Sequence, residues 1–225
     1  MGQVLLINAC FPRDGLKIYS KLSPPMGLLT IAAQLEEKGF DVRLIDPQIE
    51  DNYNDKIEIE LKDKPIFVGM TVFMGKNILN AVEISKFIKR RSPNTPIVFG
   101  GPLATSSPEI CFDNAPVDYI VMGMGEYTSV ELARTLEHGE DATSLPHIST
   151  REGRNIKDSY FFNQDIDQLT FPRLDLREEG VRRMGTIPIM TSRGCPRNCA
   201  FCYNNTFTGR KKWFGRSGEN VLEEM

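Results

Sequence analysis

The sequence predicts an α/β fold in which helices cover both faces of a parallel β-sheet. Short aliphatic and β-branched runs alternate with amphipathic stretches over the first 140 residues, and this alternation is typical of parallel sheets. Glycine or proline follows several of these segments, as it does where helices and strands end. Hydrophobic residues make up 40% of the 225 residues, which is enough to build the core of such a fold.

Each predicted element follows from its own residue pattern. The first strand is the aliphatic run 4–8, and the stretch 26–38 has apolar residues at helical spacing with Gly39 as its C-cap. A second amphipathic helix, 77–90, ends in basic residues, which the helix dipole favours there, and Pro93 stops it. The remaining predicted elements are strands 42–46, 66–72, 97–99 and 119–122 and a helix over 129–136.

Small and polar residues follow the predicted strands. Ligands of parallel sheets bind at the carboxyl ends of the strands, and glycine at these positions lets a ligand approach the backbone closely. Tight turns alone would also explain the glycines, so both interpretations remain open at this point. The strand ends carry Asn8, Asp46, Thr71, Gly100, Gly101, Pro102, Gly123, Gly125 and Glu126.

The chain changes character after residue 140. Two strand-like pieces, 148–151 and 156–157, flank turn residues and predict a hairpin. The stretch 161–176 is irregular and is expected to be a linker that packs on a neighbouring domain. A new strand is predicted at 187–191. The resulting division is a first domain over 1–140, a hairpin and linker over 141–185, and the start of a second domain over 186–225.

Three of the five cysteines lie within eight residues, at Cys195, Cys199 and Cys202. An odd cysteine count with a tight cluster argues against a disulfide framework and favours metal binding. At C-x3-C-x2-C spacing, three thiolates can hold three irons of a [4Fe–4S] cube and leave the fourth iron open, whereas a ferredoxin adds a fourth cysteine. Zinc is disfavoured, because neither His138 nor His147 has metal-ligand spacing to the cysteines.

This cysteine segment resembles the radical S-adenosylmethionine superfamily, whose motif is C-x3-C-x-Φ-C with an aromatic residue at Φ. Phe201 occupies Φ, and the resemblance implies that its ring lies beside the adenine of S-adenosylmethionine. The resemblance also implies that Cys195, Cys199 and Cys202 bind the cluster and that S-adenosylmethionine chelates the open iron. Reductive cleavage would then release a 5′-deoxyadenosyl radical. A (β/α) barrel that begins near residue 186, and an electron donor such as flavodoxin or ferredoxin, are further implications.

The first 140 residues resemble the cobalamin-binding domain that precedes many radical S-adenosylmethionine enzymes. The resemblance rests on 23–28, 39–46, 98–102 and 117–126, although Met124 replaces a glutamate of the usual Gly-Glu-Gly-Glu ending. It implies a Rossmann-like sheet that holds the corrin at its strand-end loops. No histidine of this domain should bind cobalt, because no Asp-x-His-x-x-Gly motif occurs. The implied cofactor-binding residues are Thr71, Gly100, Gly101, Pro102, Gly123, Gly125 and Glu126.

Together the two resemblances imply a cobalamin-linked enzyme that cleaves S-adenosylmethionine, with methyl transfer as one outcome. The methylthiotransferase branch has three further cysteines in its first domain, whereas this chain has only Cys10 and Cys111 there, which are expected to be buried and unreactive. The stretch 123–128 lacks the last glycine of G-x-G-x-x-G, so a nicotinamide site is disfavoured.

Because few residues follow Cys202 and a barrel takes roughly 200 residues, the chain is expected to be a fragment that is inactive alone. The alternative is a cobalamin-binding module without catalytic activity.

Composition excludes several other classes of function. A net charge of −3 gives no global nucleic-acid footprint, and no apolar run approaches the ~20 residues of a membrane span. The first residues have no basic signal region, so the protein is expected in the cytoplasm, acting on a small molecule that the sequence does not identify.

The basic stretch 210–216 is more typical of a solvated entry to the first barrel helix than of a nucleic-acid patch. That helix is predicted over 217–225, capped by Ser217 or Asn220.

Overall fold

A computed structural model describes residues 1–10, 24–152, 165–204 and 211–225. It confirms the α/β prediction: six strands form a sheet in the order β2-β1-β3-β4-β5-β6. The first five strands are parallel, and β6 joins β5 in the antiparallel direction. The strands are β1 (Gln3–Ile7), β2 (Asp41–Ile45), β3 (Phe67–Thr71), β4 (Ile97–Gly100), β5 (Tyr119–Val121) and β6 (Ile148–Thr150).

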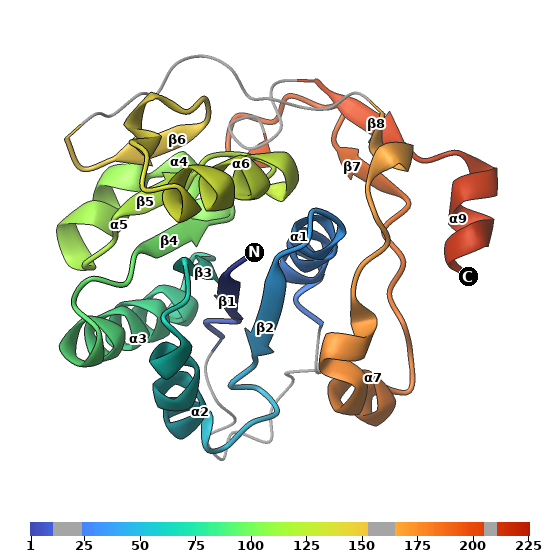
Figure 1. The fold of residues 1–225 in the computed structure, drawn as a ribbon. Helices are drawn as coiled ribbons and strands as arrows, with labels where there is room; N and C mark the ends of the chain where they lie inside the picture. Colours follow the sequence, from blue (N-terminus) through green and yellow to red (C-terminus); the bar gives the residue numbers. More distant parts are fainter. Residues whose placement is uncertain (11–23, 153–164, 205–210) are drawn as a thin grey trace.

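Helices cover both faces of this sheet, as Figure 1 shows. Alternate side chains of β1 enter two separate cores, since successive residues of a strand point to opposite faces. Leu5 and Ile7 pack with α2, α3 and α5, whereas Val4 and Leu6 pack with α1 and α6. The helices are α1 (Met26–Glu37), α2 (Tyr53–Glu60), α3 (Lys76–Arg91), α4 (Pro102–Ser106), α5 (Pro108–Asn114) and α6 (Glu126–Glu137), and short 3-10 turns lie at η1 (Leu61–Asp63) and η2 (Ala142–Ser144).

The strongly patterned helices lie where they were predicted. Helix α1 ends just before Gly39, whose φ of +91° is a conformation that suits glycine at a helix C-terminus. Helix α3 ends in Lys89, Arg90 and Arg91, as its dipole favours. The short helices α4 and α5 were not predicted. Each begins with proline, which is a helix-starting signal, but each has too few turns to show an apolar period.

The expected strand at 187–191 is wrong. No regular element occupies those residues, and the carbonyls of Met190 and Thr191 instead accept hydrogen bonds from Arg216. The strand that leads to the cysteines is β7 (Ser192–Gly194), and it pairs antiparallel with β8 (Trp213–Gly215). The basic stretch therefore contains a strand partner for the cysteine segment. The first strand of the predicted hairpin, 148–151, corresponds to β6. Its second strand, 156–157, lies outside the described residues.

The described part of the predicted linker, 165–176, packs along α1. The Arg173 amide donates to the Leu29 carbonyl over 3.2 Å, and the Gln34 amide group donates to the Thr170 hydroxyl over 2.8 Å. The C-terminal part therefore lies beyond α1 in Figure 1, coloured orange to red. Its short helical elements are η3 (Ile166–Gln168), η4 (Leu174–Arg177) and α7 (Glu178–Met184).

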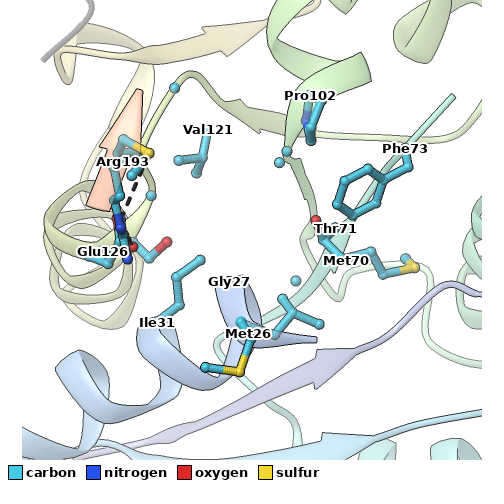
Figure 2. Close-up of a pocket in the computed structure, with 18 of the residues that line it drawn as sticks. Met26, Gly27, Ile31, Met70, Thr71, Phe73, Pro102, Val121, Glu126 and Arg193 are labelled. Atoms are coloured by element: carbon cyan, nitrogen blue, oxygen red, sulfur yellow. Dashed lines mark hydrogen bonds and ion pairs between the residues drawn. The ribbon is translucent and has the colours of Figure 1, made fainter. Parts of the chain in front are cut away.

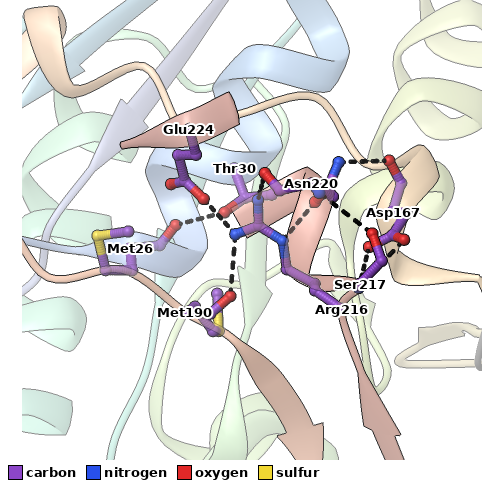
Figure 3. Close-up of polar contacts among 8 residues, drawn as sticks. All are labelled: Met26, Thr30, Asp167, Met190, Arg216, Ser217, Asn220 and Glu224. Carbon is purple, nitrogen blue, oxygen red and sulfur yellow. Dashed lines mark hydrogen bonds and ion pairs between the residues drawn. The ribbon is translucent and has the colours of Figure 1, made fainter. Parts of the chain in front are cut away.

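The last helix, α9 (Gly218–Glu224), begins where its cap predicts. The Ser217 hydroxyl accepts from the Asn220 amide over 3.1 Å, so Ser217 is the N-cap. Figure 3 shows that the Arg216 guanidinium lies between the Glu224 carboxylate and the Asn220 side chain, with the Ser217 amide donating to Asp167. These contacts attach α9 to the linker. No helix among the described ranges has the length and apolar character that a membrane crossing requires.

Candidate functional site

A cavity of about 370 Å³ opens at the carboxyl ends of β3, β4 and β5, and Figure 2 shows a close-up of it. Its volume falls within the range of small-molecule and cofactor sites. Apolar side chains such as Ile31, Met70 and Val121 make up most of its wall. Parallel sheets place ligands at this edge, so the fold and the cavity agree on where a ligand would bind.

Seven predicted site residues line this cavity together. The sequence placed them at the ends of three different strands, and the parallel topology brings those ends side by side. Their arrangement around one cavity favours the ligand interpretation over glycines that merely make turns. The seven are Thr71, Gly100, Gly101, Pro102, Gly123, Gly125 and Glu126.

Glycine is required at the tightest point of this wall. Gly101 has a φ of +90°, and a Cβ on it would stand 2.7 Å from the Thr71 hydroxyl oxygen. The Gly123 amide donates to the Thr105 hydroxyl over 2.9 Å, which fixes the neighbouring loop. A Cβ on Gly125 would meet Ile31 at 3.1 Å. Space for a side chain is therefore lacking at Gly101 and limited at Gly125.

Two further strand-end residues, Asn8 and Asp46, do not line the cavity. The Asn8 side-chain amide donates to the Asp46 carboxylate over 2.9 Å, and the buried Arg177 guanidinium pairs with the same carboxylate. Their polar groups therefore bond to each other and to the linker. The expectation that these two strand ends contribute to the same ligand site is therefore corrected: they lie outside the cavity wall, and Asp46 pairs with Arg177.

The second wall of the cavity comes from the segment that carries the cysteines. Sequence reasoning did not assign these residues to a site, although their positions beside the cysteine motif were a usable signal. Arg193 is buried and pairs with the carboxylate of Glu126. Glu126 thus faces a cation supplied by the chain itself. The residues of this wall are Met190, Ser192, Arg193, Gly194, Tyr203 and Asn204.

The three motif cysteines follow β7 directly. The Cys195 amide donates to the Lys212 carbonyl over 2.7 Å, and the Cys202 amide donates to the Cys199 carbonyl over 3.1 Å. Cys199 is exposed, and Phe201 is 94% exposed and outside the cavity lining. Within the described part of the chain, no three His, Cys, Asp or Glu side chains are arranged to hold a single metal ion. The cluster ligands and the adenine contact of Phe201 stay predictions.

The two remaining cysteines differ in burial. Cys111 is fully buried, as expected, and this burial raises the pKa of its thiol to about 12; its low reactivity stays a prediction. Cys10 is half-buried. Burial raises the pKa of its thiol, and the nearby Asp46 carboxylate raises it further, while Arg177 acts in the opposite direction. Neither thiol is poised to form a thiolate nucleophile or metal ligand at neutral pH.

A family model described as the B12 binding domain matches residues 18–133, which is more than half of the chain. The chain belongs to this family. The B12-binding match covers the strand-end loops that line the cavity from β3, β4 and β5. It confirms the resemblance to the cobalamin-binding branch of the radical S-adenosylmethionine superfamily, together with the relatives below.

Curated relatives of this B12-binding chain include methyltransferases. The chain is 32% identical over 216 residues to an uncharacterized methyltransferase, PH0819, of Pyrococcus horikoshii, covering 93% of this chain and 46% of the relative. It is 26% identical to hopanoid C-3 methylase of Methylococcus capsulatus, over 93% of this chain and 41% of that enzyme. The chain thus spans less than half the length of these two relatives.

Solved structures show the same fold. The cobalamin-dependent radical enzyme OxsB, with aqua-cobalamin and S-adenosylmethionine bound, has a TM-score of 0.80 and 26% identity, covering 100% of this chain and 31% of OxsB. The methyltransferase TsrM of Kitasatospora setae, with cobalamin and a [4Fe–4S] cluster bound, has a TM-score of 0.72 and 22% identity, covering 100% of this chain and 45% of TsrM. The predicted fold class, a B12-binding sheet followed by the start of a radical S-adenosylmethionine domain, is confirmed.

Proposed function

We propose that this chain binds cobalamin in the strand-end cavity and a [4Fe–4S] cluster at Cys195, Cys199 and Cys202, as part of a radical S-adenosylmethionine methyltransferase acting on a small molecule. The observation that carries the proposal is the composition of the cavity. One wall comes from the B12-binding strand ends and the other from the segment flanking the cysteines. A single cavity therefore lies next to both expected cofactor sites.

The cavity residues fit a corrin. Its wall is mostly apolar, and Gly100, Gly101 and Gly123 leave backbone groups within reach of a bound ligand. No histidine occurs among the lining residues that the structure describes. A corrin held there would consequently rely on backbone and apolar contacts. Gly27 also lines the cavity, and nothing lies within 4 Å of the place where its Cβ would stand, so the first turn of α1 leaves open space beside the cavity.

The cysteine segment fits a cluster with one open iron. Each of the three thiolates would bind a different iron of the cube, so the sulfur atoms need not converge on one ion. When bound, the cluster would supply the electron that cleaves S-adenosylmethionine, and cobalamin would carry the methyl group. An electron donor such as flavodoxin or ferredoxin belongs to the same proposal.

The chain's own residues would exclude water and limit movement at this site. Ile31, Met70 and Val121 form an apolar part of the wall, where electrostatic interactions would be stronger than in water. The buried Glu126–Arg193 pair brings its two charges together beside the cavity. The lack of a side chain at Gly101 lets the end of β4 lie close to Thr71 in the cavity wall. These residues would bind and orient a cofactor without providing a side-chain ligand to its metal.

The test is a titration of the anoxically purified chain with hydroxocobalamin, followed by absorbance, and an iron count after reconstitution with iron and sulfide. We expect corrin binding and about four irons per chain, with iron lost in Cys199→Ala. Gly27→Leu should weaken hydroxocobalamin binding by roughly tenfold or more, equal to ~1.4 kcal/mol, because its side chain enters open space at the cavity. Gly218→Leu is the matched control, since that helical glycine is equally unobstructed and lies in α9.

Two results would change the proposal. Corrin binding without iron would favour the alternative, a cobalamin-binding module without catalytic activity. Equal hydroxocobalamin affinity in Gly27→Leu and the unchanged chain would place the corrin elsewhere and contradict the assignment of this cavity.

A further inference from the structure

A buried ion pair connects the B12-binding part of the chain to the strand that carries the cysteines. Glu126 is the first residue of α6, and Arg193 is the central residue of β7. Their side chains are 6% and 7% exposed. Figure 2 shows them side by side at one wall of the cavity, joined by a dashed line. The Arg193 Nη1 also lies 3.8 Å from the Met124 sulfur.

This pair is costly to disrupt from one side. Charges removed from water lose hydration, so a buried cation without its partner is strongly destabilised. Glu126 also lies at the N-terminus of α6, where the helix dipole favours a negative charge. The observed position of Arg193 against α6 is therefore lower in free energy than any position that leaves Glu126 unpaired.

The short backbone segment between Arg193 and Cys195 is tightly packed, so a displacement of Arg193 would also displace Cys195. Gly194, between them, has a φ of +81°, and its Cβ position would be 2.2 Å from the Lys212 carbonyl oxygen. The Cys195 amide donates to that same oxygen over 2.7 Å. The backbone from Arg193 to Cys195 is consequently held tightly against β8, and the first cluster cysteine takes its position from β7.

We propose that the Glu126–Arg193 ion pair positions the cysteine segment against the cavity wall and couples occupation of the cavity to the order of that segment. Glu126 and Arg193 are positioning residues, since they act through β7 and not on a reacting atom. The coupling rests on the proposed function, because it takes cobalamin as the occupant. Coupling between two sites is reciprocal, so an ordered cysteine segment should in turn favour corrin binding.

The experiment is hydrogen exchange of the whole chain without iron, read at the Cys195 amide and at amides of β3 and β4. Glu126→Gln should speed exchange at Cys195 by roughly tenfold, since local opening then requires less free energy, while the sheet stays protected. Glu131→Gln is the matched control, because Glu131 lies on the same helix and pairs with Arg134 at the exposed surface. It should leave Cys195 exchange as in the unchanged chain. Hydroxocobalamin should slow Cys195 exchange in the unchanged chain and have no such effect in Glu126→Gln.

The comparison of Glu126→Gln with the unchanged chain in the absence of ligand tests the positioning role by itself. Failure of hydroxocobalamin to bind would refute the proposed function and leave that test intact. Unchanged Cys195 exchange in a folded Glu126→Gln chain would overturn the positioning role. Binding of hydroxocobalamin without any effect on Cys195 exchange in the unchanged chain would overturn the coupling. If Glu126→Gln also exposes β3 and β4, Arg193→Lys takes its place, since it keeps the charge and loses the guanidinium contact. Faster exchange confined to Cys195 would support the proposal, and equal exchange would overturn it.

Discussion

The guanidinium of Arg177 lies buried against the carboxylate of Asp46, although the two residues are 131 positions apart in the chain. Asn8 donates to the same carboxylate, and the Gln48 side-chain carbonyl accepts from Arg177 over 3.2 Å. Asp46 follows β2 at the sheet's edge, and Arg177 is the last residue of η4. This network therefore fixes the linker to the carboxyl end of β2, away from the cavity.

Removal of Arg177 should destabilise the fold strongly. Arg177→Met would leave the Asp46 carboxylate buried without a cation, and breaking a buried pair from one side costs roughly 3–5 kcal/mol. Arg182→Met is the control, since Arg182 pairs with Glu178 on the surface, where such pairs contribute about 0–1 kcal/mol. Urea denaturation of both variants measures the difference. Similar midpoints for the two variants would contradict the role assigned to Arg177.

The sequence predicted the parallel sheet well because each strand and long helix has a local signature. The run 4–8 is fully aliphatic up to its last residue, and the helices over 26–38 and 77–90 show apolar residues at a helical period. The strand-end glycines were also informative, since parallel topology alone brings the carboxyl ends of neighbouring strands together. Local pattern and topology therefore sufficed to find one wall of the cavity.

The other features depend on contacts between distant residues, which a local pattern does not contain. Asp46 looked like a ligand contact because nothing near it in sequence indicates that Arg177 returns to it. Glu126 likewise gave no sign of its partner Arg193. The predicted strand at 187–191 failed for a related reason: an apolar run forms a strand only where another strand offers hydrogen bonds, and β8 offers them to Ser192–Gly194.

Gly101 should tolerate no side chain, whereas its neighbour Gly100 should. Gly101→Ala would combine a left-handed φ of +90° with a Cβ 2.7 Å from the Thr71 hydroxyl oxygen. We expect a loss of about 1–3 kcal/mol in unfolding free energy and weaker hydroxocobalamin binding. Gly100→Ala is the matched control, because its nearest atom would be the Val121 carbonyl oxygen at an ordinary 3.7 Å. Thermal unfolding and absorbance titration of both variants test this, and equal losses would argue against backbone strain as the cause.

The cysteines should divide into two groups by their rate of alkylation. Cys111 is fully buried and its thiol has a pKa of about 12, so almost none of it is thiolate at neutral pH. Cys199 is exposed and should react first. Iodoacetamide labelling of the native, iron-free chain, followed by peptide mass spectrometry, measures each site. Labelling of Cys111 at a rate like that of Cys199 would mean that α5 opens far more readily than its packing indicates.

His147 should make the fold less stable as the pH falls. Burial lowers the pKa of its imidazole from the ordinary value of 6.5, because the charged form loses hydration. The unfolded chain then binds a proton at a higher pH than the folded chain does. Unfolding free energy consequently decreases as the pH drops below the unfolded pKa, and the stabilising contribution is fully present above it.

His147→Asn tests this without disturbing the backbone. His147 has a φ of +63°, which asparagine adopts more readily than most residues, and its carbonyl still accepts from the Met122 amide. We expect the difference in unfolding free energy between the two chains to be constant above about pH 7. Below pH 6.5 the His147 chain should lose stability relative to the variant. Urea denaturation across this range measures the difference, in which carboxylates common to both chains cancel. A difference that grows in favour of His147 at low pH would show that the folded state stabilises the imidazolium, against the effect of its burial.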